Sequence, residues 1–234
     1  MEKDVTNKKE KKSKKTILFK TNRKGRKIQL FMNVLRVLVV PILFLVKPFR
    51  YYGNHKVKDG ACVYIGNHYS ATDPLYFFTT TWEGIHFVYK SDLKKTPILG
   101  WALRKLKGIP ANRDGADIRT LLDCLKCLKN GDKLALFPEG MRNKNSEEIL
   151  EFKHGAAMLS IRAKAPIVPL VIYKRPRLFR ITHVLVGEPI ELTEYYDKKL
   201  KEEDFAEIDK KLKEHMTHMR DEHRKYLEAK KSKA

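Results

Sequence analysis

The chain has 234 residues, of which 42% are hydrophobic and 33% are charged. This length suits one domain with its own core, and the composition excludes both a bundle of membrane spans and a wholly disordered chain. Lysine and arginine number 49 against 28 aspartate and glutamate residues, so the formal net charge is +21. Such a charge attracts polyanions, which makes an anionic bilayer, an acidic carrier protein and a nucleic acid the partner classes to weigh.

The N-terminal fifty residues divide into two parts. Residues 1–15 are rich in lysine and glutamate and predict a disordered basic tail. Residues 16–50 contain an apolar run from Ile28 to Val46, whose length of about 19 residues is the lower limit for a membrane span. Arg36 lies inside the run, Pro41 should kink it, and basic residues flank it. These features favour an anchoring helix that lies in one leaflet, with a true span and a helix buried against the domain as alternatives.

Residues 51–200 alternate short apolar runs with helical patterns, which predicts a catalytic domain of the α/β class. The expected strands are Ala61 to Ile65, Ile85 to Tyr89, Lys133 to Phe137, Ile167 to Tyr173 and His183 to Val186. The expected helices are Pro74 to Thr80, Ile98 to Lys107, Ile118 to Lys129 and Gly155 to Ala163. The alternation predicts one domain with a largely parallel central sheet flanked by helices, preceded by the N-terminal membrane-associated helical segment.

Residues 201–234 predict a charged C-terminal helix and tail. An apolar stripe favours packing of this helix on the domain and consists of Phe205, Ile208, Leu212, Met216 and Met219. The histidines of the helix match no zinc signature and are interpreted as surface residues: His215, His218 and His223. Three cysteines make no closed disulfide framework, so a reducing cytosol fits best, and Cys124 and Cys127 are expected to be ordinary helix residues.

An Asn-His-x4-Asp motif directly follows the first expected strand of the domain. Neutral imidazole suits the removal of a hydroxyl proton, so His68 is the candidate general base. Asp73 can accept a hydrogen bond from the other ring nitrogen and orient the ring. The alternative is that Asp73 only caps the helix that begins at Pro74. Ser70 lacks the glycine-flanked elbow of a nucleophilic serine, so a capping role is expected for it instead of an acyl-enzyme.

A Pro-Glu-Gly-x-Arg turn follows the strand that ends at Phe137. A fixed guanidinium is the best match for a phosphate, which makes Arg142 and Arg113 candidate ligands of a phosphorylated alcohol. Glu139 beside a phosphate makes electrostatic sense only if it faces a hydroxyl or pairs with an arginine. Gly140 would let the backbone approach a ligand closely. The alternative for Arg142 is a solvated loop cation.

Four blocks occur in order, and together they resemble the glycerolipid acyltransferase family. They are residues 67–73, residues 90–93 with 97–100 and 108–115, residues 137–142, and residues 152–157 with 165–170. The likeness is greatest to the bacterial 1-acylglycerol-3-phosphate acyltransferases and covers roughly Tyr52 to Glu191. It implies transfer of a fatty acyl group from a thioester to the sn-2 hydroxyl of 1-acyl-sn-glycerol 3-phosphate, which gives phosphatidic acid in phospholipid biosynthesis.

The resemblance also implies roles for single residues. Glu139, Arg142 and Arg113 would hold the phosphorylated glycerol, and Lys90 would lie near the active centre, where Lys94 or Lys95 are alternatives. Lys153 opens the next helix, whose N-terminal amides form an anion site. The sequence departs from the family pattern at Met141, where threonine or serine is usual, and at Asn112, where aspartate is more frequent.

The resemblance further implies an acyl thioester as donor, with no cofactor and no metal. Coenzyme A and acyl carrier protein both present such a thioester, and the basic surface fits either one. The rival readings are a related enzyme that acts on glycerol 3-phosphate or a lyso-aminolipid, and a non-catalytic basic protein. No nucleic-acid-binding motif is visible, so no nucleic acid is expected as partner. The expected location is the cytoplasmic face of a membrane, with anionic lipids and lysophosphatidic acid as partners.

Overall fold

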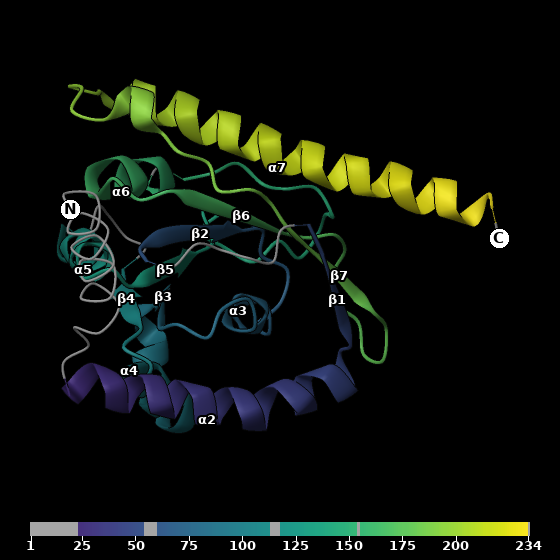
Figure 1. The fold of residues 1–234 in the computed structure, drawn as a ribbon, viewed down its shortest axis with the longest axis horizontal. Coiled ribbons are helices and arrows are strands. Elements are labelled where there is room, and N and C mark those ends of the chain that lie inside the picture. The colour runs from purple at the N-terminus through teal and green to yellow at the C-terminus, as the bar shows by residue number, and fades with distance from the viewer. Residues whose placement is uncertain (1–22, 54–59, 113–117, 154, 234) are drawn as a thin grey trace, which may run out of the picture.

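A mixed, mostly parallel sheet forms the centre of the molecule in the computed structural model, which describes residues 23–53, 60–112, 118–153 and 155–233 (Figure 1). The described residues form seven strands in the order β1-β7-β6-β2-β5-β3-β4. Only the β6–β7 pair is antiparallel among the described strands, so β1 and β7 run opposite to the other five. The strands are β1 (Phe49–Gly53), β2 (Cys62–Gly66), β3 (Ile85–Lys90), β4 (Ile109–Ala111), β5 (Lys133–Leu136), β6 (Ile167–Ile172) and β7 (Thr182–Val186).

Helices cover both faces of this sheet. Figure 1 shows α2, α3 and α4 on one side, with α6 and the long α7 on the other and α5 beside α6. Two short 3₁₀ segments also occur, at Ser91–Lys95 and Thr193–Tyr195. The helices are α2 (Arg23–Val46), α3 (Pro74–Phe78), α4 (Pro97–Lys105), α5 (Ile118–Lys129), α6 (Ala156–Ala163) and α7 (Glu202–Lys231).

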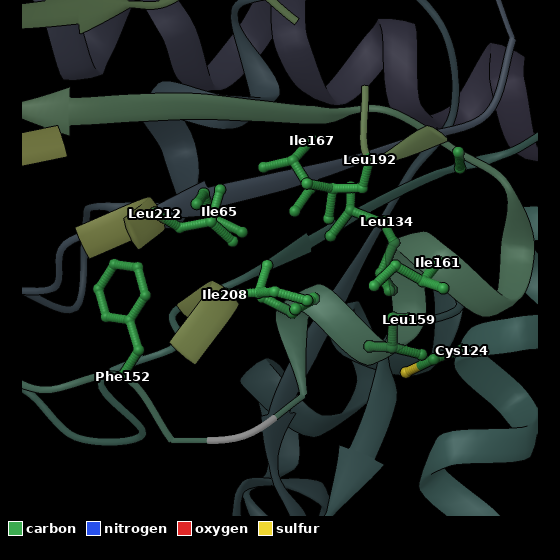
Figure 2. Packing of buried hydrophobic residues seen from close by; sticks show 14 of the residues in the cluster. Ile65, Cys124, Leu134, Phe152, Leu159, Ile161, Ile167, Leu192, Ile208 and Leu212 are labelled. Carbon is green, nitrogen blue, oxygen red and sulfur yellow. The ribbon is translucent and has the colours of Figure 1, made fainter. Parts of the chain in front are cut away.

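The core consists of two layers, because alternate residues of each strand point to opposite faces. In β2, Val63 and Ile65 join the cluster under α5, α6 and α7, whereas Cys62 and Tyr64 join the cluster under α2 and α3. Figure 2 shows the first cluster, in which strand residues meet side chains of the helices above them. A parallel sheet buried on both faces requires nearly continuous apolar strands, which is the pattern that the sequence presents.

The predicted α/β class is confirmed, and each of the five predicted strands and four predicted domain helices is found within a few residues. Two edge strands were missed. β1 and β4 lie at the two ends of the strand order, and both are largely half-exposed. β1 begins at Phe49, inside the segment assigned to the anchor, so the sheet starts earlier than that division implies. The predicted tail, residues 1–15, lies outside the described residues.

The C-terminal helix packs on the sheet as the apolar stripe predicts, but one histidine prediction was wrong. On α7, the side chains of Ile208, Leu212 and Met216 are buried against the domain. His223 is buried as well, and its Nε2 lies 2.8 Å from Nδ1 of His183 on β7. Aromatic rings surround this histidine pair, with Tyr52 centred 4.5 Å from the His223 ring. Burial and, to a smaller extent, the neighbouring His183 together lower the pKa of His223 to about 4, and burial also lowers the pKa of His183, so the pair is neutral at physiological pH.

Arg36 faces the domain, although it lies within the apolar run of α2. Its guanidinium is 4% exposed and donates to the carbonyl oxygens of Phe78 at 2.8 Å, Trp82 at 3.0 Å and Glu83 at 2.8 Å. It also contacts the Phe78 ring, with 4.4 Å between the guanidinium carbon and the ring centroid. These carbonyls belong to the end of α3 and the turn after it. The arginine therefore satisfies acceptors that the helix leaves unpaired, which explains how a buried charge is tolerated here.

The outer side of α2 remains apolar. Met32 and Leu43 are buried against the domain, whereas Leu38 and Leu45 on the other side are 61% and 74% exposed. The helix continues through Pro41 to Val46. No helix in the described ranges has both the length and the hydropathy to cross a bilayer.

We expect replacement of Arg36 by alanine to lower the free energy of unfolding by roughly 3 kcal/mol, because three carbonyl oxygens lose a charged donor, and the bond to the Phe78 carbonyl is buried. Urea denaturation followed by circular dichroism measures the effect. Arg162→Ala, at an exposed position of α6, is the matched control and should change stability by less than about 0.5 kcal/mol. Equal midpoints for the two variants would contradict this interpretation of Arg36.

Candidate active site

The site begins where β2 ends. After Gly66, the Asn67 side chain continues the ladder to β6: its amide donates to the Ile172 carbonyl at 3.0 Å, and its oxygen accepts from the Ile172 amide at 2.8 Å. Gly66 itself must be small, because a Cβ there would lie 2.5 Å from the Phe77 ring. The chain therefore leaves the sheet in a fixed direction, and His68 follows directly.

The predicted partners His68 and Asp73 lie together. Nδ1 of His68 is 3.1 Å from Oδ2 of Asp73, and the same oxygen accepts from the backbone amides of Tyr69 and Ser70, each at 2.6 Å. The Asp73 side chain makes no capping bond to α3, so the capping alternative does not describe it. Because a carboxylate only accepts, Nδ1 carries the proton of the neutral ring, and Nε2 keeps its lone pair.

Packing fixes the plane of the imidazole. The ring of His68 stacks on Phe137, with centroids 4.0 Å apart and planes inclined by 16°. The Phe77 ring of α3 packs edge-to-face against Phe137, with 5.3 Å between the ring centroids. The His68 side chain is 16% exposed, whereas Asp73 is fully buried. A base that is accessible on one side and oriented from the buried side can take a proton from a bound molecule.

Glu139 lies in the same region but is buried. It is 2% exposed, and within the described part of the chain neither carboxylate oxygen has a hydrogen-bond partner. The pKa of Glu139 is raised to about 7, chiefly by burial and to a smaller extent by the charge of Asp73, while nearby backbone groups of His68 and Leu150 partly offset the rise. Glu139 forms no ion pair with a described residue, so of the two alternatives for this side chain, pairing with Arg142 is not found. Arg113 lies outside the described residues.

The Pro-Glu-Gly turn brings Gly140 and Lys153 close in space. Gly140 has φ +68°, in the left-handed region that favours glycine. A Cβ there would lie 2.8 Å from Cδ of Lys153, so the lysine side chain covers this turn. The Lys153 amide also donates to the Pro138 carbonyl at 2.8 Å. Arg142 follows on the exposed side of the turn, where it is open to an anionic ligand.

Lys90 stands apart from this group. It ends β3, two strands from β2 in the sheet, which places it roughly 10 Å to the side of the His68 strand. Its ammonium group pairs with Asp92. The structure therefore places Lys90 at the same edge of the sheet as His68 but does not bring the two into contact.

The prediction of an anion site at the start of α6 was wrong in one respect. The amide of Ala157 donates to Oδ1 of Asp209 on α7 at 3.1 Å. The acid of the protein's own C-terminal helix therefore occupies this helix start. The sequence does not reveal this contact because 52 residues separate the two partners.

Lys47 and Asn143 were missed. Lys47, at the end of α2, donates to Oγ1 of Thr72 at 3.1 Å and to Oγ of Ser70 at 3.4 Å, which places a cation on the loop between His68 and Asp73. In the sequence it looks like an ordinary basic residue that flanks an apolar run. The amide of Asn143 donates to the His68 carbonyl at 2.7 Å and joins the two motif loops.

A possible group of metal ligands lies at the opposite edge of the sheet. His86, Cys127 and Asp132 offer ligand atoms within 4.8 Å of one another. His86 is the second residue of β3 and Asp132 directly precedes β5, whereas His68 follows the end of β2. Burial raises the pKa of the Cys127 thiol, which disfavours the thiolate that binds metal. This group has no geometric connection with the His68 loop.

Similarity to known proteins covers the site and most of the fold. A 1-acyl-sn-glycerol-3-phosphate acyltransferase of Streptococcus pneumoniae is 29% identical over 186 residues, which are 75% of this chain and 67% of that protein. A chloroplastic enzyme of the same name from Brassica napus is 33% identical over 119 residues, which are 49% of this chain. The chain spans about a third, 33%, of that plant protein's length.

The fold is also found in a solved structure. The crystal structure of the 1-acyl-sn-glycerophosphate acyltransferase PlsC from Thermotoga maritima matches with a TM-score of 0.56 at 20% identity, over 86% of this chain and 84% of that one. The family model described as Acyltransferase matches residues 48–173. Since this matched region holds both the His68 loop and the Pro-Glu-Gly turn and exceeds half of the chain, the protein belongs to the acyltransferase family.

Proposed function

We propose that this protein transfers a fatty acyl group from a thioester to the sn-2 hydroxyl of 1-acyl-sn-glycerol 3-phosphate, which gives phosphatidic acid in phospholipid biosynthesis. The observation that carries the proposal is the 3.1 Å contact between His68 and a fully buried Asp73. The names of the relatives from Streptococcus pneumoniae and Brassica napus support the acceptor.

The reaction needs one residue that acts first as a base and then as an acid. Nε2 of His68 takes the hydroxyl proton as the lipid oxygen attacks the thioester carbonyl, and Asp73 stabilises the resulting imidazolium. The new carbon–oxygen bond forms, the carbon–sulfur bond breaks, and the proton passes from His68 to the departing thiolate. The acyl thioester is a substrate in this scheme, which requires no resident cofactor or metal.

Arg142 is the proposed phosphate ligand, together with Arg113, because a guanidinium binds phosphate through two parallel donors. Lys153 covers the turn that Gly140 shapes, and Lys90 adds positive charge from the end of β3. A further cation, Lys47, lies on the loop of His68. Glu139 is buried beside the His68 loop with a pKa of about 7, and a glycerol hydroxyl that reached it would find a hydrogen-bonding group in either protonation state.

We also propose monotopic association with the cytoplasmic face of a membrane through the outer side of α2. Most of its exposed apolar residues recur at helical spacing, and the full set is Leu30, Val34, Val37, Leu38, Ile42, Phe44 and Leu45. α4 extends this surface with Ile98, which is 84% exposed, and Trp101, which meets Phe31 of α2 at 6.0 Å. A contiguous exposed apolar surface of this kind is typical of a lipid or protein contact.

The catalytic proposal predicts that His68→Ala lowers kcat by roughly 10³-fold or more, because the general base is lost. Asp73→Asn should also lower kcat, since an amide can turn its donor toward Nδ1 and leave the ring in the wrong tautomer. Release of free thiol from an acyl thioester with lysophosphatidate as acceptor measures the rate. His218→Ala, on the exposed side of α7, is the control and should be fully active. Near-normal kcat in His68→Ala would refute the proposal.

The raised pKa of Glu139 predicts that the stability of the folded protein depends on pH. Its folded pKa of about 7 exceeds the ordinary value of 4.5, so charging it in the folded state costs free energy. Stability should therefore fall as pH rises through this window, by at most about 3 kcal/mol. Glu139→Gln should be more stable than the parent at about pH 8 and no more stable at about pH 4, as measured by urea denaturation. Glu194→Gln, at an exposed position, should change neither value.

The membrane proposal predicts that Leu38→Asp with Leu45→Asp weakens binding to vesicles that contain phosphatidylglycerol by at least about tenfold, since two charges would enter the interface. The matched control is Ile118→Asp with Leu122→Asp on α5, where the exposed fractions are 70% and 59%. Co-sedimentation measures both variants, and equal binding would exclude α2 as the contact.

A further inference from the structure

A strongly basic cleft lies between the β6–β7 connection and the C-terminal half of α7. Its volume is about 770 Å³. The only acidic residues among those that line it are Glu147 and Glu228. Its cations stand on both walls and are Lys174, Arg175, Arg177 and Arg180 on the connection, with Arg224, Lys230 and Lys231 on the helix. Such a cleft concentrates positive potential and favours a polyanionic partner.

The cleft adjoins the catalytic loop. Nη2 of Arg175 donates to the Asn143 carbonyl at 3.0 Å, and the amide of Asn143 donates to the His68 carbonyl at 2.7 Å. At the same end, the Tyr69 hydroxyl donates to the Glu147 carbonyl at 2.5 Å. Hydrogen bonds therefore connect the cleft lining with the backbone of His68 and with the side chain of Tyr69. The cleft thus lies beside the loop that carries the proposed base.

We propose that this cleft docks the acidic surface of an acyl carrier protein, whose thioester arm then reaches His68. The inference rests on the proposed function and specifies its donor. The α7 wall, from Arg224 to Lys231, spans roughly 10 Å, and the facing wall carries cations along the connection. Two extended rows of cations fit the charges of a protein surface, which are spread over a comparable length.

The same features argue against the other anionic partners. A nucleotide needs a flat face for its base, but the aromatic lining residues Tyr173 and His183 already stack on each other with centroids 6.1 Å apart, and Tyr173 meets His223 at 5.0 Å. For a bilayer, the α7 wall is on the wrong side, because α7 and the proposed lipid-facing α2 cover opposite faces of the sheet (Figure 1). The facing wall does reach the end of α2, where the Phe179 amide donates to the Val46 carbonyl at 2.8 Å, so contact with lipid is an outcome that the second test must separate.

The first test is binding of purified holo-acyl carrier protein, measured by isothermal titration calorimetry. We expect the parent protein to bind, with an affinity that falls as salt is added. Arg224→Glu with Lys231→Glu should weaken binding at least about tenfold, because two attractive contacts become repulsive. Lys211→Glu with Lys225→Glu makes the same charge change on the same helix, outside the residues that line the cleft. The proposal would be overturned if the parent protein did not bind the carrier protein, or if the cleft variant and the control variant lost the same amount of affinity.

The second test is steady-state kinetics with both thioester donors. The cleft variant should raise KM for acyl carrier protein thioester at least about tenfold, with kcat and the KM for lysophosphatidate unchanged. A rise confined to acyl-coenzyme A would assign the cleft to a nucleotide instead, and lost vesicle binding would assign it to the bilayer.

The two proposals can fail separately. Carrier binding in the cleft without acyl transfer to lysophosphatidate by the parent protein would refute the proposed function and leave the docking site standing. Acyl transfer without carrier binding would refute the docking site alone.

Discussion

The site depends on one buried carboxylate oxygen. Oδ2 of Asp73 accepts from His68 and from two successive backbone amides, and the residue is inaccessible to solvent. In such surroundings a buried charge needs several donors. The loop conformation that supplies them is therefore strongly favoured over an open one, and these bonds fix the chain between β2 and α3. The imidazole orientation follows from that fixed loop, and the Phe137 stack holds it from the other side.

The sheet accounts for the meeting of the two motifs. β2 and β5 are parallel neighbours, so the segments that follow them leave at the same edge. His68 follows β2, and Glu139 follows β5. The bond from Asn143 to the His68 carbonyl then joins the two loops directly. Two short stretches far apart in the sequence form one site because adjacent parallel strands end together, and the turn chemistry of each stretch decides which side chain reaches the shared space.

The sequence predicts what is local and misses what is distant. Buried strands with continuous apolar runs, such as Ile167–Ile172, and the strand-to-helix loop of His68 are visible because spacing alone specifies them. Arg36 looks like a charge in a membrane helix because its carbonyl partners lie 42 to 47 residues away. His223 looks like a surface residue for the same reason, since His183 is 40 residues distant. Tertiary partners decide the role of a polar side chain, and periodicity carries no information about them.

α2 is joined to both ends of the segment that carries the site. Lys47 contacts Thr72 before α3, and Arg36 binds the carbonyls after it. Glu83, at the end of this segment, forms a 2.8 Å ion pair with Lys133 at the start of β5. The apolar outer side of α2 and the loop of His68 therefore belong to one body with several independent connections. A helix that rests on lipid through that side would hold the base at a constant height above the surface, with no hinge between them, which suits an acceptor whose acyl chain stays in the bilayer.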